Sequence, residues 1–370
     1  MRAMIFTGAD RPLELTEVTL AAPGPGEVRV RVEAAGVCHS DMHVRVGEWE
    51  SPTPLVLGHE GAGVVVEVGE GVEELVEGDH VILSWIAPCG RCRFCLADRP
   101  TRCTVLGERV APGAVMADGT TRLRTADGTD VHHYLGVASF AEEVVVPASG
   151  AIRVADDIPF DCAAIIGCAV ATGVGAARTT AAVTPGSTAV VIGCGGVGLS
   201  IVQGARMGGC SRIVAVDLVP EKLATAAAVG ATDTIDGSQD DVLATLAELL
   251  PDGADYAFDA IGSARVTEQA VAALGVGGTA VVVGMAPQGV QATFDLLGLA
   301  ENDQRIVGCN MGGVRPRVDF PILVEQYRSG ELRLEEMITG HRPLSEADAA
   351  FDDLAAGRAL RTILQPSRGA

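Results

Sequence analysis

Residues 187–217 read STAVVIGCGGVGLSIVQGARMGGCSRIVAVD. The apolar run TAVVI predicts a buried strand, and the glycine-rich GCGGVG that follows it opens a helix running through Gln203. A second apolar run, RIVAVD, predicts another strand. A strand, a crossover helix and a second strand of this length form the repeating unit of a parallel, doubly wound α/β sheet.

The turn inside this unit carries the spacing G-x-G-x-x-G at Gly193, Gly195 and Gly198. The first glycine permits a tight turn, the second lets the backbone approach a pyrophosphate, and the third lets the helix pack closely on the strand. The motif is weak by itself, but here it follows a strand and opens a helix whose N-terminus would face phosphates. We therefore expect a dinucleotide at this turn, including a contact at Gly196.

Asp217 ends the second strand, where a carboxylate would accept hydrogen bonds from the hydroxyls of an adenosine ribose. It would also repel a 2′-phosphate, and the following Leu218 and Val219 supply no arginine to receive one. Lys222 lies one helical turn further on and could reach the same ribose. The sequence therefore predicts NAD as the dinucleotide in preference to NADP.

The flanks of this α/β stretch are β-rich. Alternating runs at residues 26–38, 60–72 and 78–89 predict strands separated by glycine turns, and the tail ends on a short strand, RTILQP. Later strand-like runs, DYAFDAIG, GTAVVVG and DQRIVG, extend the parallel sheet. We predict an α/β protein in which a β-rich domain (residues 1–169 and 313–370) is interrupted by a doubly wound parallel-sheet domain (residues 170–312).

Four cysteines lie close together in CGRCRFCLADRPTRC, residues 89–103. Nothing marks the chain as secreted, which disfavours disulfides. Four thiolates around one tetrahedral Zn²⁺ make a closed, structural site. An iron–sulfur cluster is the alternative, although bacterial ferredoxin motifs continue with three residues and Cys-Pro, where this chain has seven residues. The predicted ligands are Cys89, Cys92, Cys95 and Cys103.

Three further residues stand in distinctive settings: Cys38 in GVCHSDMH, His59 in LGHEGAG and Cys168 in IIGCAVATG. Two thiolates and one imidazole leave the fourth tetrahedral position open, which is the arrangement of a catalytic zinc. Spacing alone would not group these residues, because a single cysteine in an apolar run, such as Cys168, is more often a small buried core residue.

Composition excludes several classes of function. The 370 residues are 48% hydrophobic with a formal charge of −21, so the chain is globular and repels nucleic acid. The N-terminal MRAMIFTGADRPLEL lacks a long apolar stretch, and the uncharged residues 269–294 break at GVGG into a helix-like and a strand-like half. We expect a cytoplasmic protein that binds neither nucleic acid nor membrane.

Taken together, the motifs resemble those of zinc-dependent alcohol dehydrogenases of the medium-chain dehydrogenase/reductase family. The matching stretches, which include GRALRTIL at the end, follow the family order over residues 24–364. The resemblance implies a GroES-like β-rich catalytic domain, a Rossmann domain, and two Zn²⁺ per chain, one catalytic and one structural. It implies hydride transfer between NAD and a primary, apolar or aromatic alcohol, with the reverse reduction of an aldehyde or ketone.

The resemblance also assigns roles to single residues. The catalytic zinc would be held by Cys38, His59 and Cys168, with Glu60 nearby and Asp41 orienting His59. Ser40 and His43 would relay the substrate proton. Coenzyme contacts are expected at His39 and Arg361 for the pyrophosphate, where His39 replaces a frequent arginine, and at Thr172, Val197, Val283 and Met285 around the nicotinamide. Trp49, Trp85 and Met285 would line the substrate pocket.

Other functions remain open from the sequence. A subset of the family oxidises hydroxymethyl adducts of glutathione or mycothiol, and Arg109, Arg122 and Arg124 could receive the carboxylates of such a thiol. A biosynthetic carbonyl reductase is a further alternative. A non-catalytic NAD- and zinc-binding protein would be expected to lack a ligand or relay residue, and this chain retains all of them.

The assembly can also be anticipated. The long segment from Thr104 to Ser139 resembles that of dimeric family members, since tetrameric bacterial members usually shorten it. We expect a homodimer formed through the last strand of the α/β domain, near residues 292–312, where the edges of two sheets would pair across a two-fold axis, with a tetramer as the alternative.

Overall fold

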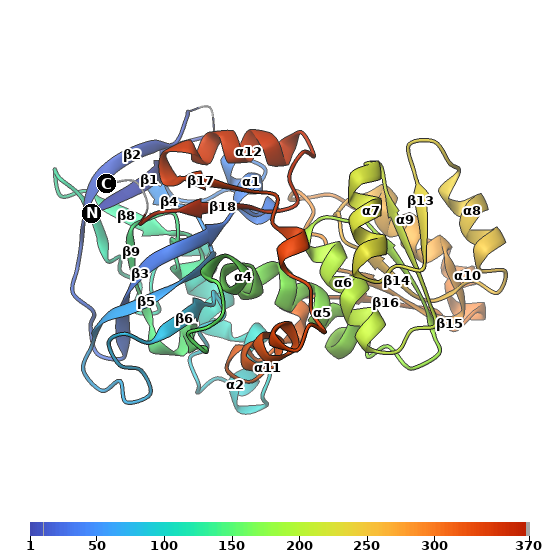
Figure 1. The fold of residues 1–370 in the computed structure, drawn as a ribbon, viewed down its shortest axis with the longest axis horizontal. Coiled ribbons are helices and arrows are strands. Elements are labelled where there is room, and N and C mark those ends of the chain that lie inside the picture. Colours follow the sequence, from blue (N-terminus) through green and yellow to red (C-terminus); the bar gives the residue numbers. More distant parts are fainter. Residues whose placement is uncertain (10, 368–370) are drawn as a thin grey trace. The chain divides into compact units, whose positions relative to one another are not determined.

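The computed structural model describes residues 1–9 and 11–367 and divides into two compact units (Figure 1). The first unit comprises Met1–Cys168 together with the C-terminal segment from Arg315, and the second comprises Ala169–Val314. The chain passes from the first unit to the second inside the helical stretch Phe160–Thr180.

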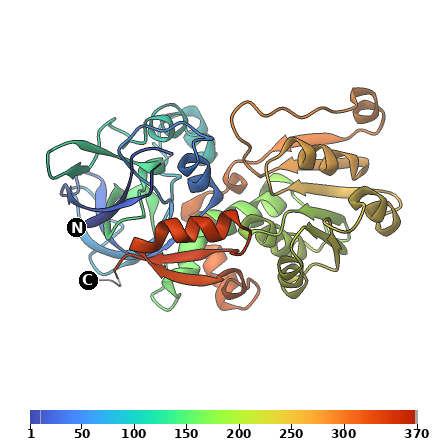
Figure 2. The ribbon, with the colours of Figure 1, turned by 90° about the horizontal axis from the view of Figure 1, so that it is seen from above.

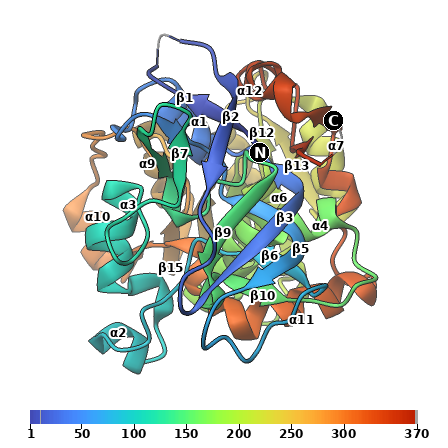
Figure 3. The same ribbon diagram turned by 90° about the vertical axis from the view of Figure 1, so that its left-hand side faces the viewer.

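The first unit is built from two β-systems (Figure 3). A closed barrel contains, in order, β1 (Arg2–Phe6), β2 (Glu14–Leu20), β7 (Leu123–Thr125), β8 (Asp130–His133) and β4 (Leu55–Val56). A seven-stranded sheet contains, in order, β10 (Ala151–Arg153), β6 (His80–Leu83), β5 (Glu60–Val68), β3 (Glu27–Gly36), β18 (Thr362–Gln365) and β17 (Gly340–Pro343), with β9 (Glu143–Pro147) paired to β3.

Strand β3 shows why these residues form a sheet. Val28, Val30 and Val32 are fully buried, whereas Arg29 and Arg31 between them reach toward solvent. This alternation buries one face of a β-strand, because successive side chains point to opposite faces. The β-rich character predicted for the N-terminal half is therefore confirmed.

The helices of the first unit are short, apart from one near the C-terminus. They are α1 (His39–Arg45), α2 (Arg93–Leu96), the π-helical turn Leu106–Val110 continuing into α3 (Ala111–Gly113), α4 (Phe160–Ile165), α11 (Pro316–Arg328) and α12 (Ala347–Ala355). Single 3-10 turns cover Pro100–Arg102, Tyr134–Gly136, Ala148–Gly150, Glu335–Met337 and Leu344–Glu346.

The second unit is a doubly wound sheet of six strands, all parallel. Their order is β13 (Asp233–Asp236), β12 (Arg212–Asp217), β11 (Thr188–Ile192), β14 (Ala254–Asp259), β15 (Leu274–Val282) and β16 (Arg305–Gly308). The predicted parallel sheet is confirmed, with β11 beside the point where the strand order reverses. Strand β13 was not predicted, because its sequence DTID is short and polar.

The helices of the second unit connect these strands. They are α5 (Ala171–Gly175), α6 (Gly196–Met207), α7 (Pro220–Val229), α8 (Val242–Leu249), α9 (Ala264–Ala272) and α10 (Leu296–Glu301), with a π-helical turn at Ala176–Thr180 and a 3-10 turn at Met311–Gly313. The π-helical turn Ile166–Val170 spans the boundary between the units. A long connection without regular structure leads from β15 to α10, drawn in orange in Figure 2.

Among the described residues, one helical stretch, Phe160–Thr180, is long and apolar enough to span a membrane, but 89% of its most apolar window is buried inside the protein. The stretch is therefore mostly covered by other parts of the protein. The uncharged residues 269–294 form parts of α9 and β15, as the sequence predicted, and not a continuous helix.

Candidate active site

Four side chains of the first unit converge in one buried cluster. Cys38 precedes α1, His59 and Glu60 lie at the start of β5, and Cys168 lies in the helical stretch that follows α4. One ligand atom from each residue lies within 4.8 Å of the others, and all four residues are buried. The structure therefore brings together the three residues predicted as catalytic-zinc ligands.

The imidazole of His59 is oriented for a metal. Its Nδ1 lies 3.2 Å from Oδ1 of the fully buried Asp41, whose carboxylate also accepts the backbone N–H groups of Cys38 (3.3 Å) and Gly58 (2.9 Å). Its Nε2 is buried and has no hydrogen-bond partner among the residues that the structure describes. Because buried polar atoms are normally paired, an unpaired imidazole nitrogen beside two sulfurs fits a metal ligand.

The electrostatics of the cluster favour a cation. The hydrogen bond from Cys168, together with the charge of Arg361, holds the pKa of the Cys38 thiol well below its usual value despite burial. The same interaction, with burial, raises the pKa of Cys168 well above its usual value. Burial opposes the charged form of His59, but Asp41 outweighs it and raises the pKa of His59. A divalent cation would replace the protons that these groups share, so that both thiols are deprotonated and the imidazole is neutral.

Arg361 lies inside this cluster. Its Nη2 is 3.3 Å from Oε1 of Glu60 and 3.6 Å from Sγ of Cys38, and its Nε is 3.2 Å from Oε2 of Glu60. Burial raises the pKa of Glu60 to about 7 even though Arg361 opposes the shift. The sequence placed Arg361 on the coenzyme pyrophosphate, whereas the structure shows it 3% exposed and paired with Glu60. A pyrophosphate contact at this residue therefore stays a prediction.

The two residues predicted to relay protons lie on α1. Oγ of Ser40 is 3.9 Å from Sγ of Cys38. His43 bonds through Nδ1 to Oε2 of Glu48 at 2.5 Å, and its ring stacks on Trp49 with the ring centroids 4.4 Å apart. Glu48 was missed by the sequence reasoning, since an acidic residue in a turn carries no signal of a partner.

Tyr134 was also missed. Its hydroxyl donates to the backbone oxygen of Ser40 at 2.9 Å, and its ring meets the His59 ring edge-on at 5.7 Å. Burial raises the pKa of Tyr134 well above its usual value, so the hydroxyl remains a donor. No local sequence signal could have found this contact, because the two partners are 94 positions apart.

The four cysteines of residues 89–103 form the second cluster. Their sulfurs lie within 4.8 Å of one another, with separations of 3.9 Å for Cys89–Cys95 and 3.5 Å for Cys92–Cys95. Sulfurs at about 2.3 Å from a tetrahedral zinc would be about 3.8 Å apart. All ten cysteines lie in the described residues and are free thiols, so disulfides do not compete for these ligands.

The glycine-rich turn of the second unit has the predicted geometry. Gly193 has a φ of +99°, and a Cβ at Gly198 would come within 1.7 Å of the Gly193 oxygen. A Cβ at Gly195 would meet nothing within 4 Å, which leaves room for a ligand at the N-terminus of α6. The carboxylate of Asp217 accepts the N–H groups of Cys194 (2.7 Å), Leu218 (2.8 Å) and Val219 (3.0 Å), so it is held at this turn.

The remaining predicted contacts divide between the units. In the second unit, Thr172 is buried and donates to Sδ of Met311, Val283 is buried, Val197 and Lys222 are half-buried, and Met285 is 53% exposed. In the first unit, His39 is exposed, while Trp49 and Trp85 are half-buried against the β-rich core. Roles for these residues in binding coenzyme or substrate remain proposals.

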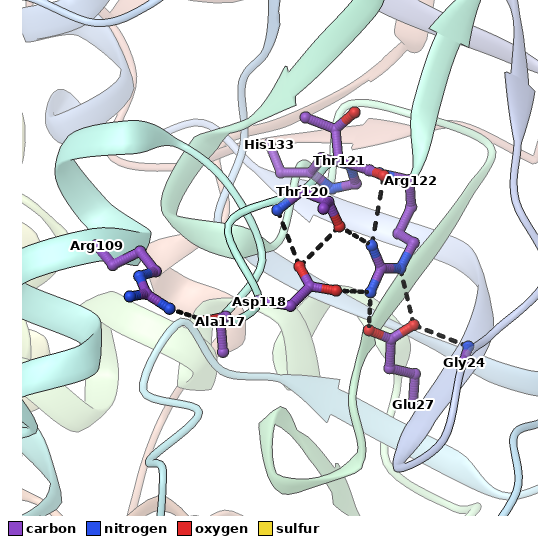
Figure 4. Close-up of polar contacts among 9 residues, drawn as sticks. All are labelled: Gly24, Glu27, Arg109, Ala117, Asp118, Thr120, Thr121, Arg122 and His133. Carbon is purple, nitrogen blue, oxygen red and sulfur yellow. Dashed lines mark hydrogen bonds and ion pairs between the residues drawn. The ribbon is translucent and has the colours of Figure 1, made fainter.

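The arginines considered for a thiol's carboxylates are mostly committed elsewhere. Arg122 pairs with Glu27 and Asp118, as Figure 4 shows, and Arg124 pairs with Asp130. Arg109 is exposed and donates to the backbone oxygen of Ala117. Within the described residues these side chains form no carboxylate-binding cluster, so that part of the sequence interpretation is not supported for Arg122 and Arg124.

A doubly wound parallel sheet with a glycine-rich turn, a closed four-sulfur site and a Cys₂His cluster define a zinc-containing dehydrogenase, the class for which this ligand set is a known catalytic centre. Residues 24–156 match the alcohol dehydrogenase GroES-like domain, and residues 196–328 match the zinc-binding dehydrogenase domain. The chain belongs to the zinc-containing medium-chain alcohol dehydrogenases.

Similar proteins support this assignment over almost the whole chain. The S-(hydroxymethyl)glutathione dehydrogenase of Saccharomyces cerevisiae is 37% identical, covering 98% of this chain and 95% of that protein. The alcohol dehydrogenase class-3 of Cereibacter sphaeroides is 38% identical, covering 98% and 99%. The crystal structure of benzyl alcohol dehydrogenase from Acinetobacter calcoaceticus is 32% identical with a TM-score of 0.93, covering 98% of each chain.

The family settles several predictions. The protein is an NAD-dependent zinc oxidoreductase with a GroES-like and a Rossmann domain, and two cysteine-rich sites suit one structural and one catalytic zinc. Its substrate is a small-molecule alcohol or aldehyde.

Proposed function

We propose that this dehydrogenase oxidises the hydroxymethyl adduct that formaldehyde forms with a low-molecular-weight thiol such as glutathione or mycothiol. Relatives that are 36–38% identical over 98–99% of the chain are S-(hydroxymethyl)glutathione dehydrogenases or class-3 alcohol dehydrogenases. The adduct carries a primary alcohol, so the residues that serve any alcohol serve it as well. The observation that carries the alcohol chemistry is the Nε2 of His59, which has no hydrogen-bond partner among the described residues and belongs to the same cluster as Cys38 and Cys168.

An aromatic alcohol is the second candidate. Trp49 stacks on His43, one of the proposed relay residues, and would present a flat apolar surface near the reacting group. The structural similarity to benzyl alcohol dehydrogenase supports the same choice. The commitment of Arg122 to Glu27 and Asp118 removes one candidate for binding a charged thiol.

Cys38, His59 and Cys168 would hold the catalytic metal, and Asp41 fixes the ring of His59 for that purpose. When bound, zinc would supply Lewis-acid activation and NAD would supply the hydride acceptor. The hydroxyl of Ser40 accepts the proton of the alcohol as it releases its own proton toward His43, and His43, held by Glu48, passes a proton onward to solvent. Glu60 and Arg361 form a buried ion pair that balances charge beside Cys38.

The second unit would bind the coenzyme. The pyrophosphate would lie at the N-terminus of α6, against Gly193, Gly195, Gly196 and Gly198, and Asp217 would accept the ribose hydroxyls. His39, Thr172, Val197, Lys222, Val283 and Arg361 are the further proposed coenzyme contacts. Met285 is proposed for both coenzyme and substrate, and Trp49 and Trp85 for substrate.

We also propose a cytoplasmic homodimer. The ten free thiols fit a reducing compartment. Strand β16 is the edge of its sheet, and the neighbouring α10 exposes Leu296 (75%) and Leu297 (65%), which a second copy could cover.

The test is NADH formation by zinc-loaded protein with formaldehyde, with and without glutathione or mycothiol, beside ethanol, benzyl alcohol and cinnamyl alcohol. Turnover of formaldehyde only when a thiol is present supports the first proposal. Efficient turnover of benzyl or cinnamyl alcohol, with no response to thiol, replaces it with the second.

A further inference from the structure

Tyr134 contacts both Ser40, a proposed relay residue, and His59, a proposed metal ligand. Its side chain is buried, at 5% exposed, and donates through its hydroxyl to the backbone oxygen of Ser40 at 2.9 Å. Its ring lies edge-on against His59, with the two rings inclined at 77°. Ser40 lies on α1, His59 at the start of β5, and Tyr134 directly after β8, so three segments distant in sequence meet at this one side chain.

His133, the residue before Tyr134, is itself held by hydrogen bonds to two other segments. His133 is fully buried, and its Nε2 accepts the backbone N–H of Arg122 at 2.9 Å. The backbone N–H of His133 donates to the Ala114 oxygen at 2.7 Å. Burial lowers the pKa of His133 to about 3, so the ring stays neutral and Nε2 stays an acceptor.

Arg122 is anchored in turn by a nearly buried ion pair (Figure 4). Its Nη2 lies 2.6 Å from Oε1 of Glu27 and 2.8 Å from Oδ2 of Asp118, and its Nε lies 2.9 Å from Oε2 of Glu27. The side chains of Arg122 and Glu27 are only 14% and 11% exposed. Since Glu27 begins β3, the pair ties the β7–β8 hairpin to the seven-stranded sheet.

We propose that Tyr134 is a positioning residue for the dehydrogenase reaction, acting through Ser40, and that Glu27, Arg122 and His133 form a brace that holds it in place. The proposal rests on the relay role given to Ser40 above. Helix α1 has only seven residues and would not hold its first turn rigid by itself. A displacement of about 1 Å in a reacting group can cost about 10²-fold in rate, so a fixed Ser40 matters.

Tyr134→Phe tests the hydroxyl while keeping the ring. We expect kcat with the alcohol to fall about tenfold, which is ~1.4 kcal/mol in the barrier. The solvent deuterium isotope effect on kcat should rise, because proton transfer through a misplaced Ser40 becomes slower. The zinc content and the KM for NAD should not change. Tyr327→Phe is the matched control, since it also loses a phenol hydrogen bond to Glu335, and we expect it to leave both kcat and the isotope effect unchanged.

A double-mutant cycle with Ser40→Ala separates this inference from the proposal beneath it. Ser40→Ala keeps the backbone oxygen that Tyr134 binds, so only the relay hydroxyl is lost. We expect Ser40→Ala to be slow and Tyr134→Phe to add little to it. If Ser40→Ala is slow but Tyr134→Phe is normal, or the two losses multiply, the positioning role is wrong and the relay stands. If Ser40→Ala keeps the wild-type rate, the relay role of Ser40 is wrong. The positioning role of Tyr134 is then wrong too, because it depends on that relay.

The brace is tested by Arg122→Gln, with Arg124→Gln as its control, since Arg124 lies on β7 two residues further along the chain. Arg124 pairs with Asp130, but their side chains are 66% and 59% exposed, so its loss should change little. We expect Arg122→Gln to lower kcat about threefold and to raise the isotope effect as Tyr134→Phe does. Glu27→Gln should reproduce the change. A lower melting temperature with an unaltered isotope effect in both variants would reduce the brace to a purely structural role.

Discussion

The two cysteine clusters of the first unit are built in opposite ways. Cys89, Cys92, Cys95 and Cys103 come from one short loop, and three of the four are partly exposed. Cys38, His59 and Cys168 come from three distant segments, are all buried, and are surrounded by Asp41, Glu60 and Arg361. A local loop with four equivalent ligands suits a closed site that stabilises its own fold. A buried set of three proposed ligands, which would leave a tetrahedral position for substrate, suits chemistry.

The largest effect on turnover should follow from removing a proposed metal ligand from the buried cluster. Cys38→Ser removes one of the three proposed ligands, and we expect turnover to fall by about 10³-fold or more, since a catalytic metal contributes several kcal/mol to the barrier. Circular dichroism and the melting temperature should stay near the wild-type values. An active Cys38→Ser protein would contradict the assignment of catalysis to the buried cluster.

The loop cluster should respond in the reverse manner. Cys92→Ser should destabilise the first unit by about 3 kcal/mol or more, because binding of structural zinc contributes directly to folding. That corresponds to a fall of roughly 6–12 °C in melting temperature. The fraction that remains folded should keep a kcat close to the wild-type value. Full stability in Cys92→Ser would mean that the loop site holds no zinc of structural consequence.

The next largest effect should come from losing the contact that orients the imidazole of His59. Asp41→Asn keeps the size of the side chain but removes the charge that faces Nδ1 of His59. We expect a loss of about 10- to 100-fold in activity or zinc affinity, as is typical for partners of metal-bound histidines. Zinc release to a chelator, followed together with turnover, is the measurement. Unchanged zinc retention and unchanged kcat would show that Asp41 serves only to cap α1.

The smallest effect concerns His133, the brace residue whose burial makes the stability of the protein depend on pH. His133 has a folded pKa of about 3 and an unfolded value near 6.5, so the unfolded chain binds more protons between these values and stability falls as the pH drops below ~6.5. The expected loss is about 1.4 kcal/mol per pH unit, or about 2 kcal/mol at pH 5. His133→Gln keeps an acceptor and should flatten this dependence in melting curves, while His132→Gln should not. Parallel curves for both variants would contradict the assignment.

The two clusters also differ in how far the sequence alone could predict them. The four-cysteine loop and the turn at Gly193–Gly198 are local, so their spacing alone predicted their geometry. Cys38, His59 and Cys168 could be grouped only through a family resemblance, because nothing in their spacing joins them. Tyr134 with Ser40 and Arg122 with Glu27 are 94 and 95 positions apart, and only the fold brings them together.

Arg361 shows the limit of the resemblance itself. The motif GRALRTIL led us to predict a pyrophosphate contact for Arg361. Its burial against Glu60 and Cys38 depends on β18 pairing with β3, a long-range contact that no local pattern encodes. Arg122 is a similar case, since its charge suggested a ligand and the fold uses it for an internal ion pair.

The most direct test of the account replaces both metals with Co²⁺ and records the visible spectrum with and without the alcohol substrate. We expect two cobalt ions per chain. The bands of the Cys38–His59–Cys168 site should shift on addition of alcohol, since three protein ligands would leave a tetrahedral position for it, and those of the four-sulfur site should stay unchanged. A spectrum of two bound ions that does not respond to alcohol would show that both sites are closed and would contradict the catalytic assignment.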